Sequence, residues 1–137
     1  MDIAVGQTSH REMVVSEEMV ARYAEITGDY NPLHFDQDFA KSTRFGGLIS
    51  QGGITTGLLH ALVAMDMPGP GTVFMTQRWS FPRPVYIGDT IRAEATVLSI
   101  HERKPRAEIQ FVVTNQDGLE VLNGEATVYQ VEPVSGA

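Results

Sequence analysis

The sequence predicts an α+β fold in which an antiparallel β-sheet covers one buried α-helix. From Ile54 to Met65 the chain is nearly apolar on every helical face, and a helix without a polar side lies in a core or a membrane. From Thr72 onward, apolar and polar residues roughly alternate in short runs separated by turn signals, which is typical of half-buried strands. The helix and the apolar face of the sheet bury each other. The pattern predicts the class, but not how the sheet wraps.

The composition is that of an ordinary globular protein, with 42% hydrophobic and 20% charged residues. We expect one domain over 1–137, because a chain of 137 residues can bury a substantial core. The absence of cysteine excludes disulfides, a thiolate nucleophile and zinc–thiolate sites, and we expect no metal site. A net charge of −7 argues against nucleic acid as a partner, although a local basic cluster could still hold a small anion.

No feature of the sequence suggests export or membrane insertion. The first 15 residues lack a basic segment followed by an apolar one, so we expect a cytoplasmic protein. The central apolar run is interrupted by His60 and Asp66, and it is shorter than the roughly 20 apolar residues that span a bilayer. We therefore expect a core helix and no membrane contact.

The first part of the chain predicts an edge strand and then a helix. Residues 1–15 alternate weakly and form a strand at most. Ser16 is expected to cap a helix over 16–27, whose acidic first turn suits the helix dipole, and Gly28 fits its C-terminal end. The turn-forming residues Gly28–Pro32 predict a loop.

A second short helix is expected over 37–42. Asp36 could cap it, and Phe39 and Ala40 would face inward. A loop over 44–51 then leads into the central helix.

The central helix is expected over Gly52–Met67, where the prolines and glycines of 68–71 stop it. Its start is unusual, because Gly52 and Gly53 leave the N–H groups of the first turn open to close approach by another molecule. These groups form the positive end of the helix dipole.

The remainder of the chain predicts about four antiparallel strands in a meander, with the N-terminal segment at an edge. The strands are expected over Thr72–Arg83, 91–98, 109–113 and Leu119–Val131, and the tail from Glu132 is expected to fray. The turns between them are expected at Gly88-Asp89, at the polar residues 101–106, and at the hairpin signal 115–118. Three aromatic residues are expected in the sheet core, with the lining of an acyl tunnel as the alternative for alternate ones: Phe74, Trp79 and Phe81.

One segment has a specific resemblance. Tyr23–His34 reads YAEITGDYNPLH and resembles the hydratase 2 signature of the MaoC-like (R)-specific enoyl-CoA hydratases. The resemblance continues through Gln51–Gly53 and through Phe81–Asp89, and covers about residues 16–131. It implies the hot-dog fold, an antiparallel sheet wrapped around a long central helix.

The resemblance also implies the activity: reversible addition of water to the double bond of a trans-2-enoyl thioester, giving an (R)-3-hydroxyacyl thioester. The implied substrate is an acyl-CoA, with an acyl-carrier protein as the alternative carrier. Coenzyme A is then part of the substrate, and no separate cofactor is expected. The implied assembly is a homodimer or a dimer of such dimers, joined through the sheets.

Hydration of an enoyl thioester needs a base for water, a proton for Cα and a stabiliser for the enolate oxygen. Asp29 and His34, on one loop stiffened by Pro32, could perform the proton transfers, because histidine titrates near neutral pH. By resemblance they are the catalytic pair. The amide of Asn31 would hold either the loop or the water.

By resemblance, the Gly52 N–H is the oxyanion donor, and a fixed N–H at a helix N-terminus is suited to that role. The alternative is that Gly52 makes only a tight turn. Gln51 replaces a histidine common at this position of the family, and we expect Gln51 and Gly53 to lie beside the substrate.

Two further features leave alternatives open. Arg103 and Lys104, with Arg106, make a basic turn that would hold the phosphates of coenzyme A or would simply be solvated. His60, inside the apolar helix, is expected to be a core or pocket-lining histidine.

Two other functions compete with hydration. A hot-dog thioesterase would use an acidic residue on or near the central helix, but Asp66 lies at the far end of that helix. A non-catalytic acyl-binding subunit would have no need for both Asp29 and His34. Acyl length and carrier depend on pocket walls from several strands and are not predicted.

Overall fold

A computed structural model describes residues 1–133 of the chain. The helices are α1 (Glu17–Thr27), α2 (Pro32–Phe35), α3 (Gln37–Lys41) and α4 (Gly52–Ala61), and α4 continues as a π-helix over Leu62–Asp66. The strands are β1 (Thr8–Val14), β2 (Thr72–Ser80), β3 (Thr90–Ile100), β4 (Arg106–Thr114) and β5 (Glu120–Gln130). The expected frayed tail falls mostly on residues 134–137, outside the described residues.

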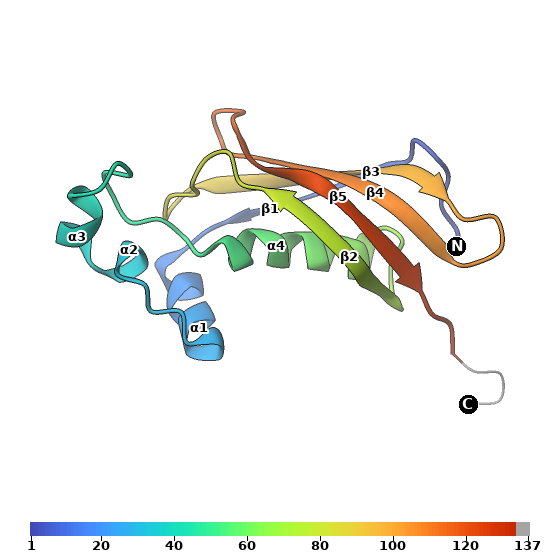
Figure 1. Cartoon of the computed structure of the whole chain (residues 1–137), viewed down its shortest axis with the longest axis horizontal. Coiled ribbons are helices and arrows are strands. Elements are labelled where there is room, and N and C mark those ends of the chain that lie inside the picture. The colour runs from blue at the N-terminus through green and yellow to red at the C-terminus, as the bar shows by residue number, and fades with distance from the viewer. Residues whose placement is uncertain (134–137) are drawn as a thin grey trace.

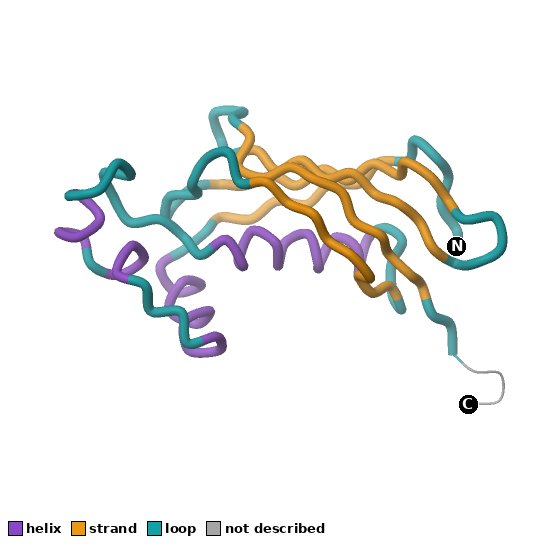
Figure 2. The backbone as a smooth tube through the Cα atoms, in the orientation of Figure 1, coloured by secondary structure: helices purple, strands orange, loops and turns teal. Residues whose placement is uncertain are grey.

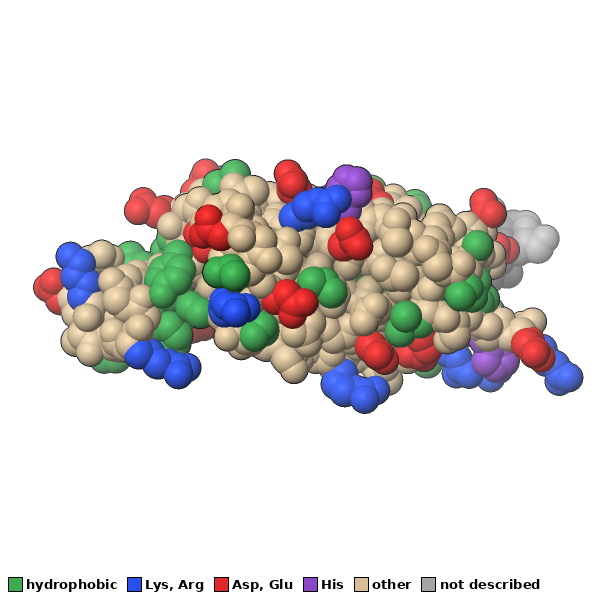
Figure 3. All heavy atoms as spheres, turned by 90° about the horizontal axis from the view of Figure 1, so that it is seen from above, with side chains coloured by type: hydrophobic (Ala, Val, Ile, Leu, Met, Phe, Trp, Pro, Cys, Tyr) green, Lys and Arg blue, Asp and Glu red, His purple; other side chains and the backbone are tan. Residues whose placement is uncertain are grey.

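The sheet lies over α4, as the sequence predicts. All five strands pair antiparallel in the order β1-β3-β4-β5-β2, and α4 runs along one face of this sheet (Figure 1). Strands form one layer and helices the other, with α1, α2 and α3 projecting beyond one end of the sheet (Figure 2). The sheet's outer face carries acidic and basic side chains interspersed, as expected for a solvated surface (Figure 3).

The core forms between α4 and the inner face of the sheet. Alternate residues of β3 and β4 are buried, which matches the predicted pattern. The helix contributes Leu58, Leu59, Leu62 and Val63, each at most 4% exposed. Because a fully buried aliphatic side chain contributes about 1.5–3 kcal/mol, this seam fixes α4 beneath the sheet.

The prediction that α4 is buried on every side is wrong. Gly57, His60 and Met65 lie on a face turned away from the core and are exposed. His60 is therefore not a core residue: its ring lies 4.4 Å from that of Phe74, and its Nε2 lies 3.2 Å from the Gln77 amide nitrogen.

The predicted meander is correct for β3, β4 and β5 but wrong for β2. Strand β2 pairs with β5 and forms an edge, and β3 lies between β1 and β4. The pattern of a strand specifies which face is apolar but not which neighbour it pairs with.

The aromatic residues near β2 divide into two groups. Phe74 and Trp79 pack against Phe111, with ring centroids 6.1 and 5.4 Å away, as predicted. A register shift between Phe74 and Thr76 lets these side chains, five residues apart, face the same side. Phe81 follows the end of β2 and is 53% exposed, so its predicted core position is wrong.

The N-terminal predictions are largely confirmed. The Ser16 hydroxyl accepts the Met19 N–H at 3.2 Å, and Gly28 ends α1 at a φ of 81°. The Asp36 carboxylate likewise caps α3, but only Ala40 faces inward, because Phe39 is 45% exposed.

Candidate functional site

The signature residues gather at one end of the molecule, where α1, α2 and the start of α4 meet (Figure 1). Pro32 does not remain in the predicted loop but opens the one-turn helix α2, which places His34 on a helix. Proline suits the first helical position, because its φ is already set and its missing N–H has no partner there. The Asn31 Oδ1 caps this helix by accepting the Leu33 N–H at 3.0 Å.

The His34 ring has a defined orientation and tautomer. It is 7% exposed, and its Nδ1 lies 2.7 Å from the carbonyl oxygen of Ile49. Because a carbonyl can only accept, Nδ1 carries the proton and donates it, which leaves Nε2 of the neutral ring as an acceptor.

Asp29 faces the free nitrogen of His34. Its Oδ2 lies 3.7 Å from His34 Nε2, while its Oδ1 accepts the Asn31 N–H at 3.3 Å. The Asp29 side chain is 43% exposed, whereas His34 is buried. Two acceptors thus lie side by side, one buried and one reached by solvent.

Backbone hydrogen bonds hold Ile49 and Ser50, just before α4, to two other parts of the chain. Ile49 N–H donates to the Leu33 carbonyl at 3.1 Å, and Ser50 N–H donates to the Val85 carbonyl at 2.7 Å. These bonds join the segment to α2 on one side and to the connection between β2 and β3 on the other.

Gln51 binds protein rather than facing open space. It is 2% exposed, and its Nε2 donates to the Val20 carbonyl of α1 at 3.0 Å. Its Oε1 is buried and makes no hydrogen bond among residues 1–133. Gln51 therefore ties α1 to the start of α4, and its predicted place beside the substrate is not supported by this geometry.

Gly52 and Gly53 open α4 and are not among the glycines with positive φ, so the tight-turn interpretation of Gly52 is not supported. Both have close neighbours instead. A Cβ at Gly52 would lie 3.3 Å from Cε1 of Phe81, and a Cβ at Gly53 would overlap the hydroxyl of Tyr23. Glycine at 53 thus makes room for the Tyr23 side chain of α1, and glycine at 52 lets the Phe81 ring lie against the helix start.

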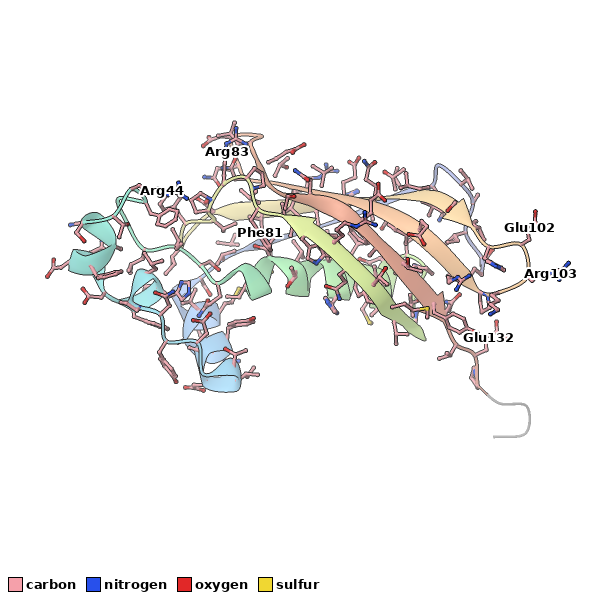
Figure 4. The ribbon with its side chains drawn as sticks, viewed as in Figure 1. Arg44, Phe81, Arg83, Glu102, Arg103 and Glu132 are labelled. Atoms are coloured by element: carbon pink, nitrogen blue, oxygen red, sulfur yellow. The ribbon has the colours of Figure 1, made fainter. Side chains whose placement is uncertain are left out.

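A cavity of about 260 Å³ adjoins Gly52. Its lining includes Ser50, Phe81, Arg44 and Arg83, and Figure 4 shows these arginines on neighbouring loops at the same end of the molecule. The sequence interpretation missed both arginines. The available signal was that Arg44 lies in the loop before the central helix and Arg83 lies in the Phe81–Asp89 segment that carries the family resemblance.

The structure does not bring Arg103 and Lys104 to this end within one chain. They lie in the turn between β3 and β4, and Figure 4 shows Arg103 at the opposite end of the sheet from Arg44 and Arg83. The backbone N–H groups of both residues donate to His101 Nδ1, at 3.1 and 3.0 Å, which folds the turn.

Two negative findings apply to residues 1–133. No three histidine or acidic side chains there are grouped so that they could hold a metal ion. No helix in that part of the chain is long and apolar enough to cross a membrane.

The comparison with protein families accounts for this arrangement. The model described as "MaoC like domain" matches residues 3–119, which is most of the chain. This chain belongs to the MaoC-like domain family. The α+β architecture with its central helix is accordingly the hot-dog fold, as the sequence resemblance implies.

Several known proteins match over nearly the whole chain. A 3-hydroxybutyryl-CoA dehydratase from Methylorubrum extorquens is 38% identical over 93% of this chain and 80% of its own length. A mitochondrial 3-hydroxyacyl-[acyl-carrier-protein] dehydratase from Arabidopsis thaliana is 31% identical over 91% of this chain and 76% of its own length. The solved (R)-hydratase from A. caviae, involved in PHA biosynthesis, superposes with a TM-score of 0.90 at 33% identity, covering 95% of this chain and 98% of that one.

The Asn31 cap yields a prediction about the position of His34. Asn31→Ala should lower the free energy of unfolding by about 1 kcal/mol, the usual cost of a lost N-cap. Because α2 carries His34, the same change should speed solvent exchange of the Nδ1–H that Ile49 accepts, measured by NMR. Asn31→Ser, which keeps a capping oxygen, is the matched control and should preserve both properties. Equal exchange rates in all three proteins would contradict the positioning role.

Proposed function

We propose that this chain catalyses the reversible addition of water to the double bond of a trans-2-enoyl thioester, giving the (R)-3-hydroxyacyl thioester. The observation that carries the proposal is the pair of acceptors at 3.7 Å, His34 Nε2 and Asp29 Oδ2, in a signature and family whose relatives are hydratases and dehydratases. It is a hydro-lyase activity that requires no redox or group-transfer step.

The pair can bind and activate one water molecule. Water has two O–H donors, and the two acceptors provide one for each of them. As the water oxygen attacks Cβ, one proton passes to the pair, and a proton is delivered to Cα to complete the addition. Dehydration is the reverse. Histidine is suited to both transfers, because its ordinary pKa lies near neutral pH.

The thioester oxygen gains negative charge when Cβ is attacked, and the Gly52 N–H is the proposed donor to it. The first N–H groups of a helix have no intrahelical acceptor and lie at the positive end of the dipole. Removing one such donor costs about 3–4 kcal/mol of transition-state stabilisation in enzymes that depend on it. Gly53 contributes by letting Tyr23 pack against the helix start.

The substrate class follows from the relatives' names, which include both coenzyme A and acyl-carrier-protein thioesters. We propose an acyl-CoA as substrate. The thioesterase alternative weakens further, because Asp66 is engaged with Arg11 at 2.9 Å and lies at the end of the helical segment away from Gly52.

We also propose a homodimer, formed through the β2 edge. Strand β2 has a free edge with Val73 and Met75, which are 53% and 55% exposed, and no proline. The other edge, β1, presents two charged residues, Arg11 and Glu12, whereas β2 carries one, Arg78. Exposed edges with apolar side chains favour strand pairing, whereas charged edges oppose it.

Removal of either acceptor should abolish most of the activity. Asp29→Asn and His34→Ala should each lower kcat by about 10²–10⁴-fold, the usual contribution of a general acid–base group. The measurement follows loss of the enoyl thioester absorbance of crotonyl-CoA, with free thiol assayed separately. Asp38→Asn and His10→Ala, at exposed positions, are the matched controls. Thiol release without hydration product would identify a thioesterase instead, and turnover within about tenfold of wild type would remove both assignments.

Gly52→Ala should reduce kcat/KM by at least about tenfold, because its methyl group occupies the approach to the N–H. Stability should change little, because Phe81 is exposed and can move, and alanine favours a helix over glycine by about 1 kcal/mol. Gly57→Ala, with nothing within 4 Å of its Cβ, measures that helical gain alone. Melting temperatures and rates are compared for all three proteins. A Gly52→Ala enzyme with wild-type kcat/KM would rule out the oxyanion role.

Sedimentation should give twice the chain mass for the wild type at micromolar concentration. Met75→Lys places a charge on the β2 edge and should shift the protein towards the monomer. His10→Lys makes the matched change on β1 and should leave the dimer intact. A fully active wild-type monomer would contradict the proposed assembly.

A further inference from the structure

The cavity beside Gly52 has a distinctive charge. Among residues 1–133, Arg44 and Arg83 are the only charged side chains that line it, and no acidic side chain of that range does. The whole chain has a net charge of −7, so this is a local positive site on a negative protein. Such a cluster attracts an anion that the rest of the surface would repel.

Both guanidinium groups are held in place without an ionic partner. Arg83 Nη1 donates to the Glu120 carbonyl at 3.1 Å, and the Arg44 guanidinium lies 5.1 Å from the centre of the Phe45 ring. Neither arginine forms an ion pair with a carboxylate in residues 1–133, whereas Arg11, Arg22 and Arg92 do. A positioned guanidinium with free donors is well suited to bind phosphate.

The residues that line the cavity differ in character from the start of α4 to the exposed loops. Gly52, Ser50 and Thr55 line it where α4 begins, and Val85 and Val121 add an apolar wall. Arg44 and Arg83 are exposed on the loops outside α4, with Phe81 on the helix side of Arg83 (Figure 4). A ligand with a polar head at the helix, a partly apolar stem and an anionic tail matches this order.

We propose that Arg44 and Arg83 bind the phosphate at the end of the pantetheine arm while the Gly52 N–H binds the thioester oxygen. This rests on the proposed function and assigns substrate-binding residues to it. The arm is as long as four to five residues of extended chain, roughly 15 Å, so a phosphate joined to a thioester at Gly52 lies well away from the helix start. The phosphate belongs either to coenzyme A or to the prosthetic arm of a carrier protein.

The two arginines replace the basic turn of Arg103 and Lys104 as the phosphate site within one chain. That turn lies at the other end of the sheet (Figure 4) and does not line this cavity. Substitution of the arginines and substitution of the basic turn are therefore expected to have different effects in one assay of KM for crotonyl-CoA.

The test compares substrates with and without the phosphate. Hydration of crotonyl-CoA and crotonyl-pantetheine is measured for the wild type, Arg44→Ala, Arg83→Ala and the double variant. The double variant should raise KM for crotonyl-CoA by about tenfold or more, equivalent to about 1.4 kcal/mol, with kcat nearly unchanged. Its kinetics with crotonyl-pantetheine should equal those of the wild type. Arg92→Ala removes the same charge from the outer face of the sheet and should change neither substrate's KM.

Crotonyl-4′-phosphopantetheine and a crotonyl carrier protein distinguish the two sources of phosphate. If the double variant raises KM more for crotonyl-CoA than for either of these substrates, the arginines bind the diphosphate of coenzyme A. If KM rises equally for all three, they bind the 4′-phosphate. An equal rise in KM for crotonyl-pantetheine and crotonyl-CoA would overturn the proposal. A rise in KM for crotonyl-CoA in Lys104→Ala alone would also overturn it.

A binding measurement separates this proposal from the proposed function. Calorimetric titration with coenzyme A and with pantetheine needs no turnover. The double variant should lose about tenfold in affinity for coenzyme A and none for pantetheine. If the wild type hydrates neither thioester, the proposed reaction fails, and this titration still decides whether the arginines bind the phosphate. Equal affinity of wild type and double variant for coenzyme A would overturn their assignment.

Discussion

The hydrogen bond between His34 and the Ile49 carbonyl is the interaction on which the site depends. Ile49 also donates its own N–H to α2, and its neighbour Ser50 donates to the connection between β2 and β3. One short segment thus fixes the tautomer of the histidine and the position of the first N–H groups of α4. Because the same residues set both groups, the proposed base and the proposed oxyanion donor keep a constant position relative to each other.

The local parts of this structure follow from the sequence, and the non-local parts do not. The Ser16 cap and the Gly28 helix end are predicted because each depends on residues within a few positions. The pairing of β2 with β5 depends on contacts far apart in the chain, which alternation does not specify.

The same distinction applies to the site. Asp29 and His34 lie five residues apart in a specific signature, so their proximity is predictable. Arg44 and Arg83 are isolated in the sequence and meet only because two loops border one cavity. Arg103 and Lys104 are adjacent in the sequence and so form an evident basic pair, but adjacency does not specify at which end of a sheet a turn lies. The sequence predicts Gln51 beside a ligand, because the residues around it do not indicate its burial against α1.

The arrangement of the two acceptors has a stereochemical consequence within the proposed mechanism. An enoyl thioester is planar, with two distinguishable faces. Asp29 and His34 both belong to the α1–α2 side of the site, so water bound between them reaches only one of these faces when the carbonyl is fixed at Gly52. If the same pair returns the proton, hydrogen and hydroxyl enter from that one side. The handedness of the product is then set by the fold itself, through the side of the substrate on which the short helix α2 is packed.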